Sequence, residues 1–362
     1  MKKKLVIVLG MHRSGTSVIT RALTTLGISL GDELLPPMPD NSKGFWEDTD
    51  IVELNDLMLS ECDSSWHSLT KISEEDHALL KQRGYVLRLK ELIKKKLKKD
   101  DLLGIKDPRI PKLIGIWSEV ISSLELEVQY VVSVRNPLSV AHSLKKRNRL
   151  ETQVSCLLWL EHVINILEFT KDEDALFVEY DNIIKSPEHE LNRLSSWLSL
   201  PITKEKANEY YTTFLDQNLM HANHSLKSLE INKEIPKICL EIHQYLHDLS
   251  KEQATSREIC ATNLLKNWYQ TYNLLGYLDK SFDKAQSKEK QAIAEAQHAK
   301  AEAQHAKVEA KQSIAEAHAE VQHAQAQADG AKAEIQALLQ TTSWKITEPL
   351  RHAAQYLKKY LE

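Results

Sequence analysis

The stretch that decides the fold is "KKKLVIVLGMHRSGTSVITRALTTLG", residues 2–27. Its apolar run from Leu5 to Leu9 predicts a short buried strand of a parallel sheet over residues 4–9. A helix is predicted over residues 15–27, because apolar side chains recur along one helical face and Gly27 ends the pattern. A strand, a glycine-bearing turn and a helix in this order point backbone N–H groups at an anion. Residues 10–17 are therefore predicted to form a phosphate-binding loop.

The loop departs from the ATP-binding pattern at one position. From Gly10 to Gly15 the spacing matches G-x-x-x-x-G-K-[ST], but Thr16 occupies the lysine position. In the ATP-binding form that lysine reaches the β- and γ-phosphates, and Mg²⁺ offsets their charge. The side chains left in this loop are one guanidinium and three hydroxyls: Arg13, Ser14, Thr16 and Ser17. Such a set suits a monophosphate with an anhydride neighbour of low charge, so we expect no metal ion here.

Residues 1–200 alternate apolar strand runs with helical patterns. Strands are predicted at 4–9, 101–106, 127–134 and 175–180, and helices at 15–27, 73–99, 111–122, 137–148, 152–170 and 187–199. This alternation indicates an α/β fold, with a P-loop-like, mainly parallel sheet flanked by helices. Because ligands of such sheets bind beyond the carboxyl ends of the strands, the chemistry is expected there.

The rest of the chain is predicted to be helical. Residues 201–280 form a helical extension that closes the first domain, residues 1–280. "SFDKAQSKEK", residues 281–290, marks a compositional border. Beyond it we predict a long coiled-coil helix over residues 281–340 and an amphipathic tail over residues 341–362.

The coiled-coil prediction rests on a seven-residue repeat. "AEAQHAK" occurs twice in tandem at 294–307, and one seam position is alanine from Ala296 to Ala331, followed by Leu338. The second seam position carries Ile293, Lys300, Lys307, Ile314, Val321, Ala328 and Ile335. Because alanine and lysine make a thin seam, self-association through residues 284–340 is expected to be weak. A solitary solvated helix is the alternative.

Composition limits the function classes. The formal net charge of −4 over 362 residues gives no general case for nucleic-acid binding. Cys62, Cys156, Cys239 and Cys260 follow no metal-binding or disulfide spacing, and we predict reduced, mostly buried thiols. The first apolar run is too short for a secretory signal, and no transmembrane span is predicted. We therefore expect a cytoplasmic protein.

A second anion site is predicted after the strand at 127–134. Arg135 follows this strand, Asn136 can cap the next helix and Pro137 fits its first turn. Ser143 lies two turns into that helix. An arginine at a strand end and a serine on the following helix can hold a second phosphate of the same nucleotide. The alternative is a capped helix with Arg135 in a surface ion pair.

These stretches together resemble the sulfotransferase family that uses 3′-phosphoadenosine-5′-phosphosulfate (PAPS), in particular its bacterial, carbohydrate-acting branch. "GMHRSGTSVI" (10–19) resembles the 5′-phosphosulfate loop in its Arg-Ser-Gly-Thr form, and "VVSVRNPLSVAHSL" (131–144) resembles the 3′-phosphate motif. "LFVEYDNIIKSPEHELNRLSSWLSL" (176–200) is similar to the family's tyrosine–acid strand end and following helix.

The resemblance covers about residues 4–200 and implies PAPS as co-substrate, with no metal ion. The residues that it implies for binding PAPS are His12, Arg13, Ser14, Gly15, Thr16, Ser17, Arg135 and Ser143. The Arg-Lys-Gly loop of the cytosolic members is missing from the sequence. Part of the 3′-phosphate contact therefore has no residue assigned to it.

Sulfuryl transfer to a hydroxyl needs a base near the acceptor oxygen and positive charge at the leaving oxygen. "NSKGFWEDTDIVELND" (41–56) supplies carboxylates after a turn at Gly44, and the resemblance places an acidic base here. We predict that Glu47 is this base. The alternatives are two neighbouring acids and a histidine of the loop: Asp48, Glu53 and His12. Helix capping competes with a base role for Asp48, as loop packing does for His12.

"GIKDPRIPKL" (104–113) places further charges beyond a strand end. Lys106, together with Arg13, is predicted to stabilise the leaving group, and Arg109 to contact the substrate. A structural salt bridge between Asp107 and Arg109 is the alternative.

Two tryptophans are candidates for a sugar-binding platform. Trp46 and Trp66 can stack on a sugar ring, and Asp48 is a further candidate for a substrate contact. Core packing is the alternative for both tryptophans.

The acceptor is inferred from the end of the sequence. "TTSWKITEPLRHAAQYLKKYLE" (341–362) resembles a tail that follows coiled coils in bacterial glycosyltransferases of surface-polysaccharide assembly. This implies a carbohydrate acceptor, either lipid-linked or part of a growing glycan. Residues 284–340 are expected to mediate self-association or to bind a polysaccharide-assembly partner. The mix of apolar and basic residues in 341–362 suits either peripheral contact with the inner face of the membrane or docking against a partner protein.

Two other functions are compatible with the same sequence. The loop also suits an ATP-dependent kinase of a sugar or small molecule, with Asp107 as an Mg²⁺ ligand. A non-catalytic polysaccharide-assembly factor, tethered through its coiled coil, is the second alternative.

Overall fold

The computed structural model describes residues 3–38, 41, 43–215, 228–229, 235–252 and 263–361. The chain divides into two compact units, Met1–Phe282 and Asp283–Glu362, and each is considered by itself. Parts of the predicted helical extension lie outside the described residues, and so does Cys260.

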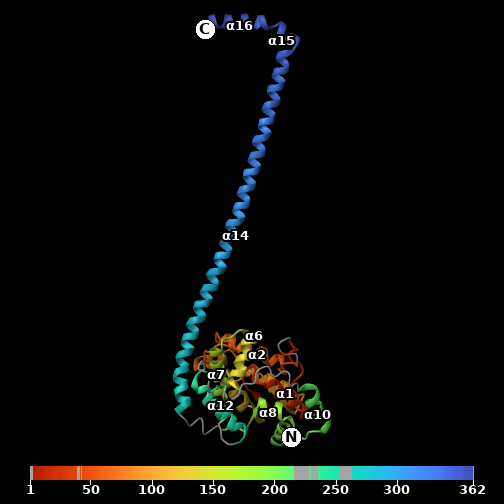
Figure 1. Ribbon diagram of the computed structural model, residues 1–362, viewed down its shortest axis with the longest axis vertical. Coiled ribbons are helices and arrows are strands. Elements are labelled where there is room, and N and C mark those ends of the chain that lie inside the picture. The colour runs from red at the N-terminus through yellow and green to blue at the C-terminus, as the bar shows by residue number, and fades with distance from the viewer. Residues whose placement is uncertain are drawn as a thin grey trace. The chain divides into compact units, whose positions relative to one another are not determined.

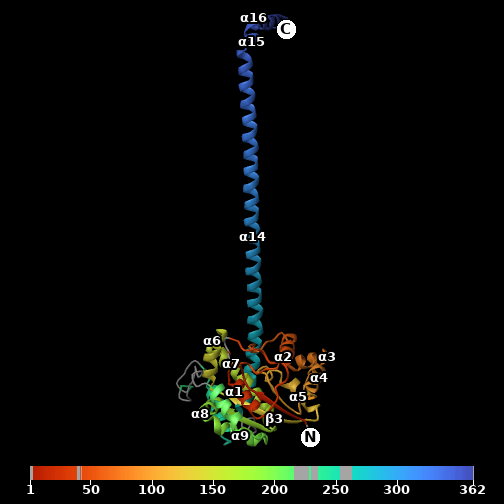
Figure 2. The same ribbon diagram turned by 90° about the vertical axis from the view of Figure 1, so that its right-hand side faces the viewer.

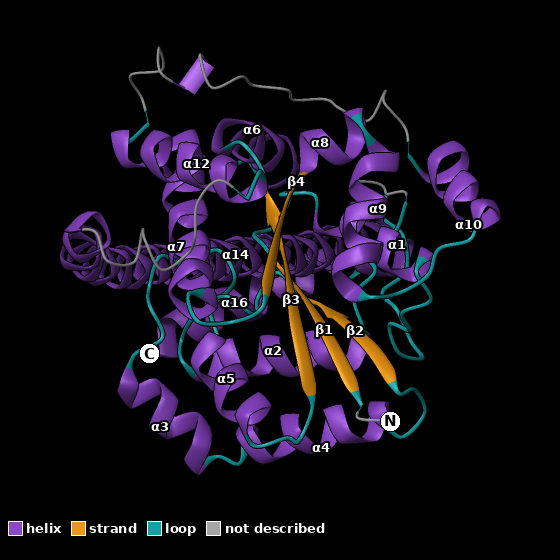
Figure 3. Ribbon diagram, turned by 90° about the horizontal axis from the view of Figure 1, so that it is seen from below, coloured by secondary structure: helices purple, strands orange, loops and turns teal. Residues whose placement is uncertain are grey.

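Among the described residues, a four-stranded parallel sheet forms the centre of the first unit (Figure 3). Its strands are β1 (Lys4–Leu9), β2 (Leu102–Lys106), β3 (Glu127–Val134) and β4 (Ala175–Glu179). They lie in the order β2-β1-β3-β4, and each neighbouring pair is parallel. All four carboxyl ends therefore meet at one edge, and the predicted α/β class is confirmed.

Helices cover both faces of the sheet, and this explains why β1 is apolar from Leu5 to Leu9. Leu5, Ile7 and Leu9 are buried on one face, and Val6 and Val8 on the other. The first face packs against α2 (Thr49–Glu61), α4 (Tyr85–Leu97), α5 (Ile114–Ser122), α6 (Pro137–Asn148) and α7 (Thr152–Thr170). The second face packs against α1 (Thr16–Thr25), α8 (Tyr180–Lys185) and α9 (Pro187–Leu198).

The prediction of one helix over 73–99 is wrong. The structure has two helices there, α3 (Glu74–Gln82) and α4. Gly84 lies between them at φ +81°, the left-handed conformation that interrupts a helix and that glycine adopts most easily. The short helix α8 was not predicted, because six residues directly after a strand show too little helical period to be recognised.

Two helices begin at side-chain caps that the sequence contains. The side chain of Asn136 accepts a hydrogen bond from the backbone N–H of Leu138 at 2.9 Å, and Pro137 is the first residue of α6, as predicted. At the start of α2, the side chain of Asp48 accepts from the N–H of Ile51 at 3.2 Å. The capping role that was considered for Asp48 is therefore present.

Helices also follow the sheet along the chain. They are α10 (Lys204–Glu209), the π-helical turn η1 (Tyr210–Phe214) and α12 (Lys237–Ser250). α12 packs against β4 and β3. Within the described part of residues 201–280, α10, η1, α12 and the residues from 263 onward are helical, and the role of this extension in closing the first domain stays a prediction.

One long helix runs from the first unit into the second (Figures 1 and 2). α14 spans Asn263–Gln340 and is followed by α15 (Thr342–Ile346) and α16 (Glu348–Leu361). The border at 281–290 is therefore a change of composition and not a helix end. Pairing of α14 with a second helix stays a prediction. Within the described residues we find no helix whose length and apolar content would let it span a membrane.

A buried ion pair joins three segments of the first unit. Lys112 Nζ, in the segment between β2 and α5, lies 2.6 Å from Glu161 Oε1 on α7, and the two side chains are 0% and 2% exposed. The same ammonium donates hydrogen bonds to the carbonyl oxygens of Ser68 and Thr70, beyond α2. Because both charges have left water, each depends on the other for compensation.

Lys112→Met is expected to lower the free energy of unfolding by about 3–5 kcal/mol, because Glu161 would keep a buried charge without its cation. Denaturant unfolding followed by circular dichroism measures the change. The double variant K112M/E161L removes both charges and should recover most of the stability. A double variant no more stable than the single one would contradict this account.

Candidate active site

The predicted phosphate-binding loop joins β1 to α1 at the carboxyl edge of the sheet. Gly15 precedes α1 at φ +99°, and a Cβ placed on it would lie 2.3 Å from the Tyr180 ring. Glycine is thus required here by both the backbone conformation and the available space. Thr16 begins α1 and is buried. The loop therefore packs tightly against the start of α8 while the N-terminus of α1 opens at the edge where ligands of such sheets bind.

The two predicted anion motifs come together in one place. Arg13 Nε donates a hydrogen bond to Ser143 Oγ on α6 at 2.8 Å. Arg135 Nη1 donates to the carbonyl oxygen of Arg13 at 2.7 Å, and Ser133 Oγ donates to the carbonyl oxygen of Ser14 at 2.8 Å. The loop after β1 and the segment after β3 therefore form a single site.

Arg135 is 9% exposed and lies inside this site. Its guanidinium carbon is 4.1 Å from the centre of the Tyr180 ring. Burial lowers the pKa of Arg135, and the nearby Arg13 lowers it further, but an arginine stays charged at neutral pH. Two neighbouring guanidiniums, one of them buried, make this part of the site attractive to an anion.

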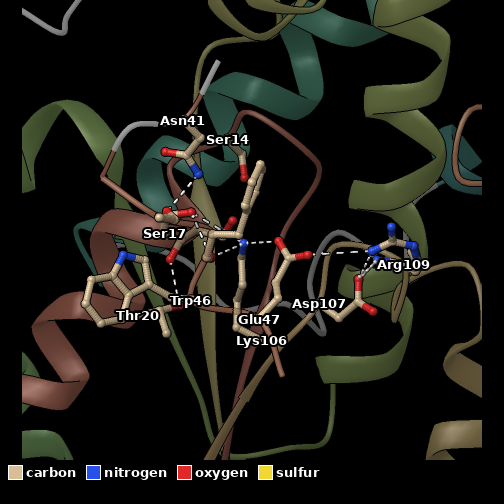
Figure 4. Close-up of polar contacts among 12 residues, drawn as sticks. Ser14, Ser17, Thr20, Asn41, Trp46, Glu47, Lys106, Asp107 and Arg109 are labelled. Atoms are coloured by element: carbon tan, nitrogen blue, oxygen red, sulfur yellow. Dashed lines mark hydrogen bonds and ion pairs between the residues drawn. The ribbon is translucent and has the colours of Figure 1, made fainter. Parts of the chain in front are cut away.

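A second cluster of charges surrounds Lys106 at the end of β2 (Figure 4). Lys106 Nζ donates hydrogen bonds to Glu47 Oε1 and to the carbonyl oxygen of Phe45, and it lies 3.4 Å from Ser17 Oγ. Ser17 in turn donates to the same carbonyl oxygen at 3.1 Å. Lys106 therefore links the phosphate-binding loop to the predicted base.

Arg109 lies on the other side of Glu47. Its Nη1 is 3.6 Å from Glu47 Oε2 and 2.9 Å from Asp107 Oδ1, and its Nε is 2.5 Å from Asp56 Oδ1. The salt bridge between Asp107 and Arg109 considered from the sequence is thus present. Asp107 is fully buried and also accepts a hydrogen bond from Asn55 at 2.8 Å.

Glu47 is buried, with 4% of its surface exposed. Burial raises the pKa of Glu47, the charge of Lys106 lowers it, and the charge of Asp107 raises it again; the net direction is upward. A carboxylate with a raised pKa is a better proton acceptor than an exposed one. The position and electrostatics of Glu47 thus suit a general base.

The two other acids predicted as alternative bases lie in different surroundings. Besides capping α2, Asp48 forms an ion pair of 2.6 Å with Lys96, which also contacts Asp50. Glu53 is exposed on α2. Of these three predicted carboxylates, Glu47 is the one in contact with Lys106 and Arg109. A substrate contact by Asp48 stays a prediction.

His12 contributes a neutral imidazole to the loop. It is 9% exposed, and burial first, then the charge of Arg109, holds its pKa well below the usual value. Its ring lies 4.4 Å from the Trp66 ring, centre to centre, and Arg147 lies 5.3 Å above the same tryptophan. The loop therefore has an aromatic and cationic surface beside it.

The two candidate tryptophans lie in different clusters. Trp46, at φ +59°, packs edge-on against Phe214 at 5.9 Å, and Arg21 lies 5.6 Å from its ring. In Figure 4 its ring and Arg109 lie on opposite sides of Lys106. The structure therefore brings Trp66, and not Trp46, next to His12.

Three residues of the site were not predicted from the sequence. Tyr180, the tyrosine of the motif at 176–200, contacts Arg135 and lies against Gly15, a role that the motif alone does not specify. Ser133 fixes the loop through the carbonyl of Ser14, and Phe214 packs on Trp46. The local sequence around Ser133 and Phe214 does not show these contacts, because their partners lie more than 100 residues away along the chain.

The comparison with protein families identifies the class of protein. The family model described as "Sulfotransferase domain" matches residues 3–259. The chain therefore belongs to the sulfotransferase family, as the sequence resemblance predicted. Members of this family transfer a sulfuryl group. Family membership therefore does not support the ATP-dependent kinase alternative.

Several solved structures are similar to the chain at low identity. The sulfotransferase domain of the Synechococcus PCC 7002 olefin synthase has 16% identity and a TM-score of 0.44, and the match covers 68% of this chain and 95% of that one. A sulfotransferase from Mycobacterium tuberculosis H37Rv has 12% identity and a TM-score of 0.33, covering 68% and 76%. Retinol dehydratase, solved with androsterone and the inactive cofactor PAP, has 12% identity and a TM-score of 0.30, covering 75% and 80%. No curated protein matches the sequence.

Gly15→Ala is expected to abolish detectable binding of adenosine 3′,5′-bisphosphate, because the new methyl group would collide with Tyr180 and displace the loop. Titration calorimetry measures the binding. Gly27→Ala is the matched control, since Gly27 has a similar φ of +88° but no atom within 4 Å of an added Cβ. That control should cost about 1 kcal/mol of stability and leave binding intact. Equal affinities of the two variants would contradict the packing argument.

Proposed function

We propose that the protein transfers a sulfuryl group from PAPS to a hydroxyl group of a carbohydrate. The observation that carries this proposal is the convergence of Arg13, Ser143 and Arg135 beside the pair of Lys106 and Glu47. The first three residues suit the two phosphate-containing ends of the donor. The last two suit the proton and charge transfers of the reaction.

The hydrogen-bond donors and charges of the loop fit the co-substrate PAPS. Backbone amides, hydroxyls and Arg13 are ligands for the 5′-phosphosulfate, and Arg135 with Ser143 for the 3′-phosphate. His12 and Gly15 belong to the same loop, where Gly15 allows the close approach of the backbone. Lysine and arginine supply the positive charge, and we assign no metal ion to the site.

In the proposed reaction, Glu47 accepts the proton of the acceptor hydroxyl. The acceptor oxygen then bonds to sulfur as the bond between sulfur and the bridging oxygen breaks, and that oxygen leaves with the 5′-phosphate. PAPS supplies the sulfuryl group, and the second product is adenosine 3′,5′-bisphosphate. Lys106 and Arg13 offset the charge on the departing phosphate.

The contact between Glu47 and Lys106 couples these two events. While Glu47 is ionised, it neutralises Lys106. When Glu47 takes up the proton, the charge of Lys106 is no longer compensated and becomes available to the leaving oxygen. Because Lys106 also lies 3.4 Å from Ser17 of the loop, it is close to the place where that oxygen would be. One proton transfer thus strengthens the stabilisation of the leaving group.

The surface around Trp66 supports a carbohydrate as the acceptor. Trp66 is half-buried and is flanked by His12, His67 and Arg147. An aromatic face bordered by hydrogen-bonding side chains suits a sugar ring, which has apolar C–H faces and polar edges. Arg109, which lies 3.6 Å from Glu47, is the cation that we propose as a substrate contact.

Arg13→Ala and Arg135→Ala should each weaken the binding of adenosine 3′,5′-bisphosphate roughly ten- to a hundredfold, since each removes a charge-assisted contact to a different phosphate. Titration calorimetry measures both, and Arg149→Ala, an exposed arginine at the end of α6, is the control. An unchanged affinity of Arg135→Ala would show that the second phosphate is held elsewhere.

Glu47→Gln should bind the bisphosphate normally but lower turnover roughly a hundredfold or more, as expected for loss of a general base. Turnover is measured as bisphosphate released from PAPS in the presence of a panel of glycosides. Glu53→Gln, an exposed acid on the same segment, should retain turnover. Near-normal activity of Glu47→Gln would transfer the role to His12 or Asp48. A site that binds the bisphosphate but transfers sulfate to none of the glycosides would favour the non-catalytic alternative.

A further inference from the structure

The last helix of the second unit, α16, separates its side chains by polarity. With 100° of rotation per residue, the apolar residues between Glu348 and Lys359 fall on one arc of roughly 160°. They are Pro349, Leu350, Ala353, Ala354, Tyr356 and Leu357. The remaining arc carries Glu348, Arg351, His352, Gln355, Lys358 and Lys359. No polar residue lies within the apolar arc, and no apolar residue lies within the polar arc.

The apolar arc is open to solvent. Leu350 and Tyr356 are each 71% exposed and Leu357 is 65% exposed, while Ile346, just before the helix, is 70% exposed. Exposure of several large apolar side chains on one contiguous face is unfavourable in water. The face is therefore suited to a partner that removes it from water.

The charges around this face favour one kind of partner. α16 carries three basic residues against one acidic residue, whereas the whole chain has a net charge of −4. Lys358 borders the apolar arc on one side, with Arg351 next to it. His352 borders the arc on the other side, with Lys359 next to it, and Gln355 lies in the middle of the polar arc. Basic side chains near both borders would lie at the level of lipid headgroups when the apolar face is inserted.

We propose that α16 lies in the surface of a bilayer that contains anionic lipids, with its apolar arc toward the acyl chains and its basic residues on the headgroups. A second copy of this helix is a poorer partner. Pairing two such faces would bring the basic borders of both helices close together, and like charges repel. An anionic surface instead attracts both borders at once. The inference concerns location and does not depend on the identity of the donor or acceptor.

Flotation of the full-length protein with vesicles tests this inference. The protein should float with vesicles of phosphatidylcholine and phosphatidylglycerol in equal amounts, and much less with phosphatidylcholine alone. The variant K358Q/K359Q should bind the mixed vesicles roughly 25-fold more weakly, since each cation near an anionic surface contributes roughly fivefold. L350Q/L357Q should lose binding. His352→Gln, on the polar arc, should bind like the unmodified protein at pH 8.

Several results would overturn the proposal. Equal flotation with neutral and anionic vesicles would show that the basic residues do not contribute to binding. Normal flotation of L350Q/L357Q would show that the apolar face is not inserted. If the unmodified protein is a dimer that does not float, and L350Q/L357Q is a monomer, the apolar face binds a second copy of the chain instead of a membrane. Normal affinity for adenosine 3′,5′-bisphosphate shows that the first unit, Met1–Phe282, is still folded in a variant. K358Q/K359Q leaves the apolar face intact, so it remains informative if the leucine variant loses helix.

Discussion

The parallel pairing of β1 with β3 is the constraint on which the site depends. Leu9, the last residue of β1, pairs with Val132, so the loop after β1 and the segment from Ser133 onward leave neighbouring strands side by side. Ser133 and Arg135 then hold two carbonyl groups of the loop. Because a peptide unit is planar and trans, fixing the carbonyl of Ser14 also fixes the direction of the N–H of the next residue. The loop is thus shaped before any ligand arrives, which lowers the cost of binding.

Charge compensation is the second constraint, and it joins structure to chemistry. Lys106, Glu47, Arg109 and Asp107 alternate in sign and are largely buried. Removing one member leaves its neighbour as an uncompensated charge, so the same residue can affect both stability and turnover. For Glu47, measuring both bisphosphate affinity and turnover separates a loss of folded protein, which lowers both, from a loss of catalysis, which lowers turnover alone. Lys112 and Glu161 show the contrasting case, because their pair joins three segments and has no contact with the loop among its hydrogen bonds.

Much of the fold could be predicted from local sequence, whereas contacts between distant segments could not. The strands predicted at 4–9 and 127–134 agree with the structure because buried parallel strands are rich in apolar residues. The single helix over 73–99 was wrong because one glycine outweighed a continuous periodic pattern. In the site, the loop and Arg135 were recognisable from local motifs. The surroundings of Trp46 were not, because Arg21 and Phe214 reach it only through the tertiary fold.

The amphipathic character of the tail depends on where its helix begins. Pro349 lies in the first turn of α16, where the missing N–H of proline removes no helical hydrogen bond. α14 ends at Gln340, so the apolar face of α16 need not continue the seven-residue seam of the long helix. A helix bound to the bilayer would confine the catalytic unit near a lipid-linked acceptor and raise its effective concentration there. At this raised concentration the acceptor would occupy the site even if the site binds a single sugar weakly. The proposed membrane location would therefore favour the proposed carbohydrate acceptor.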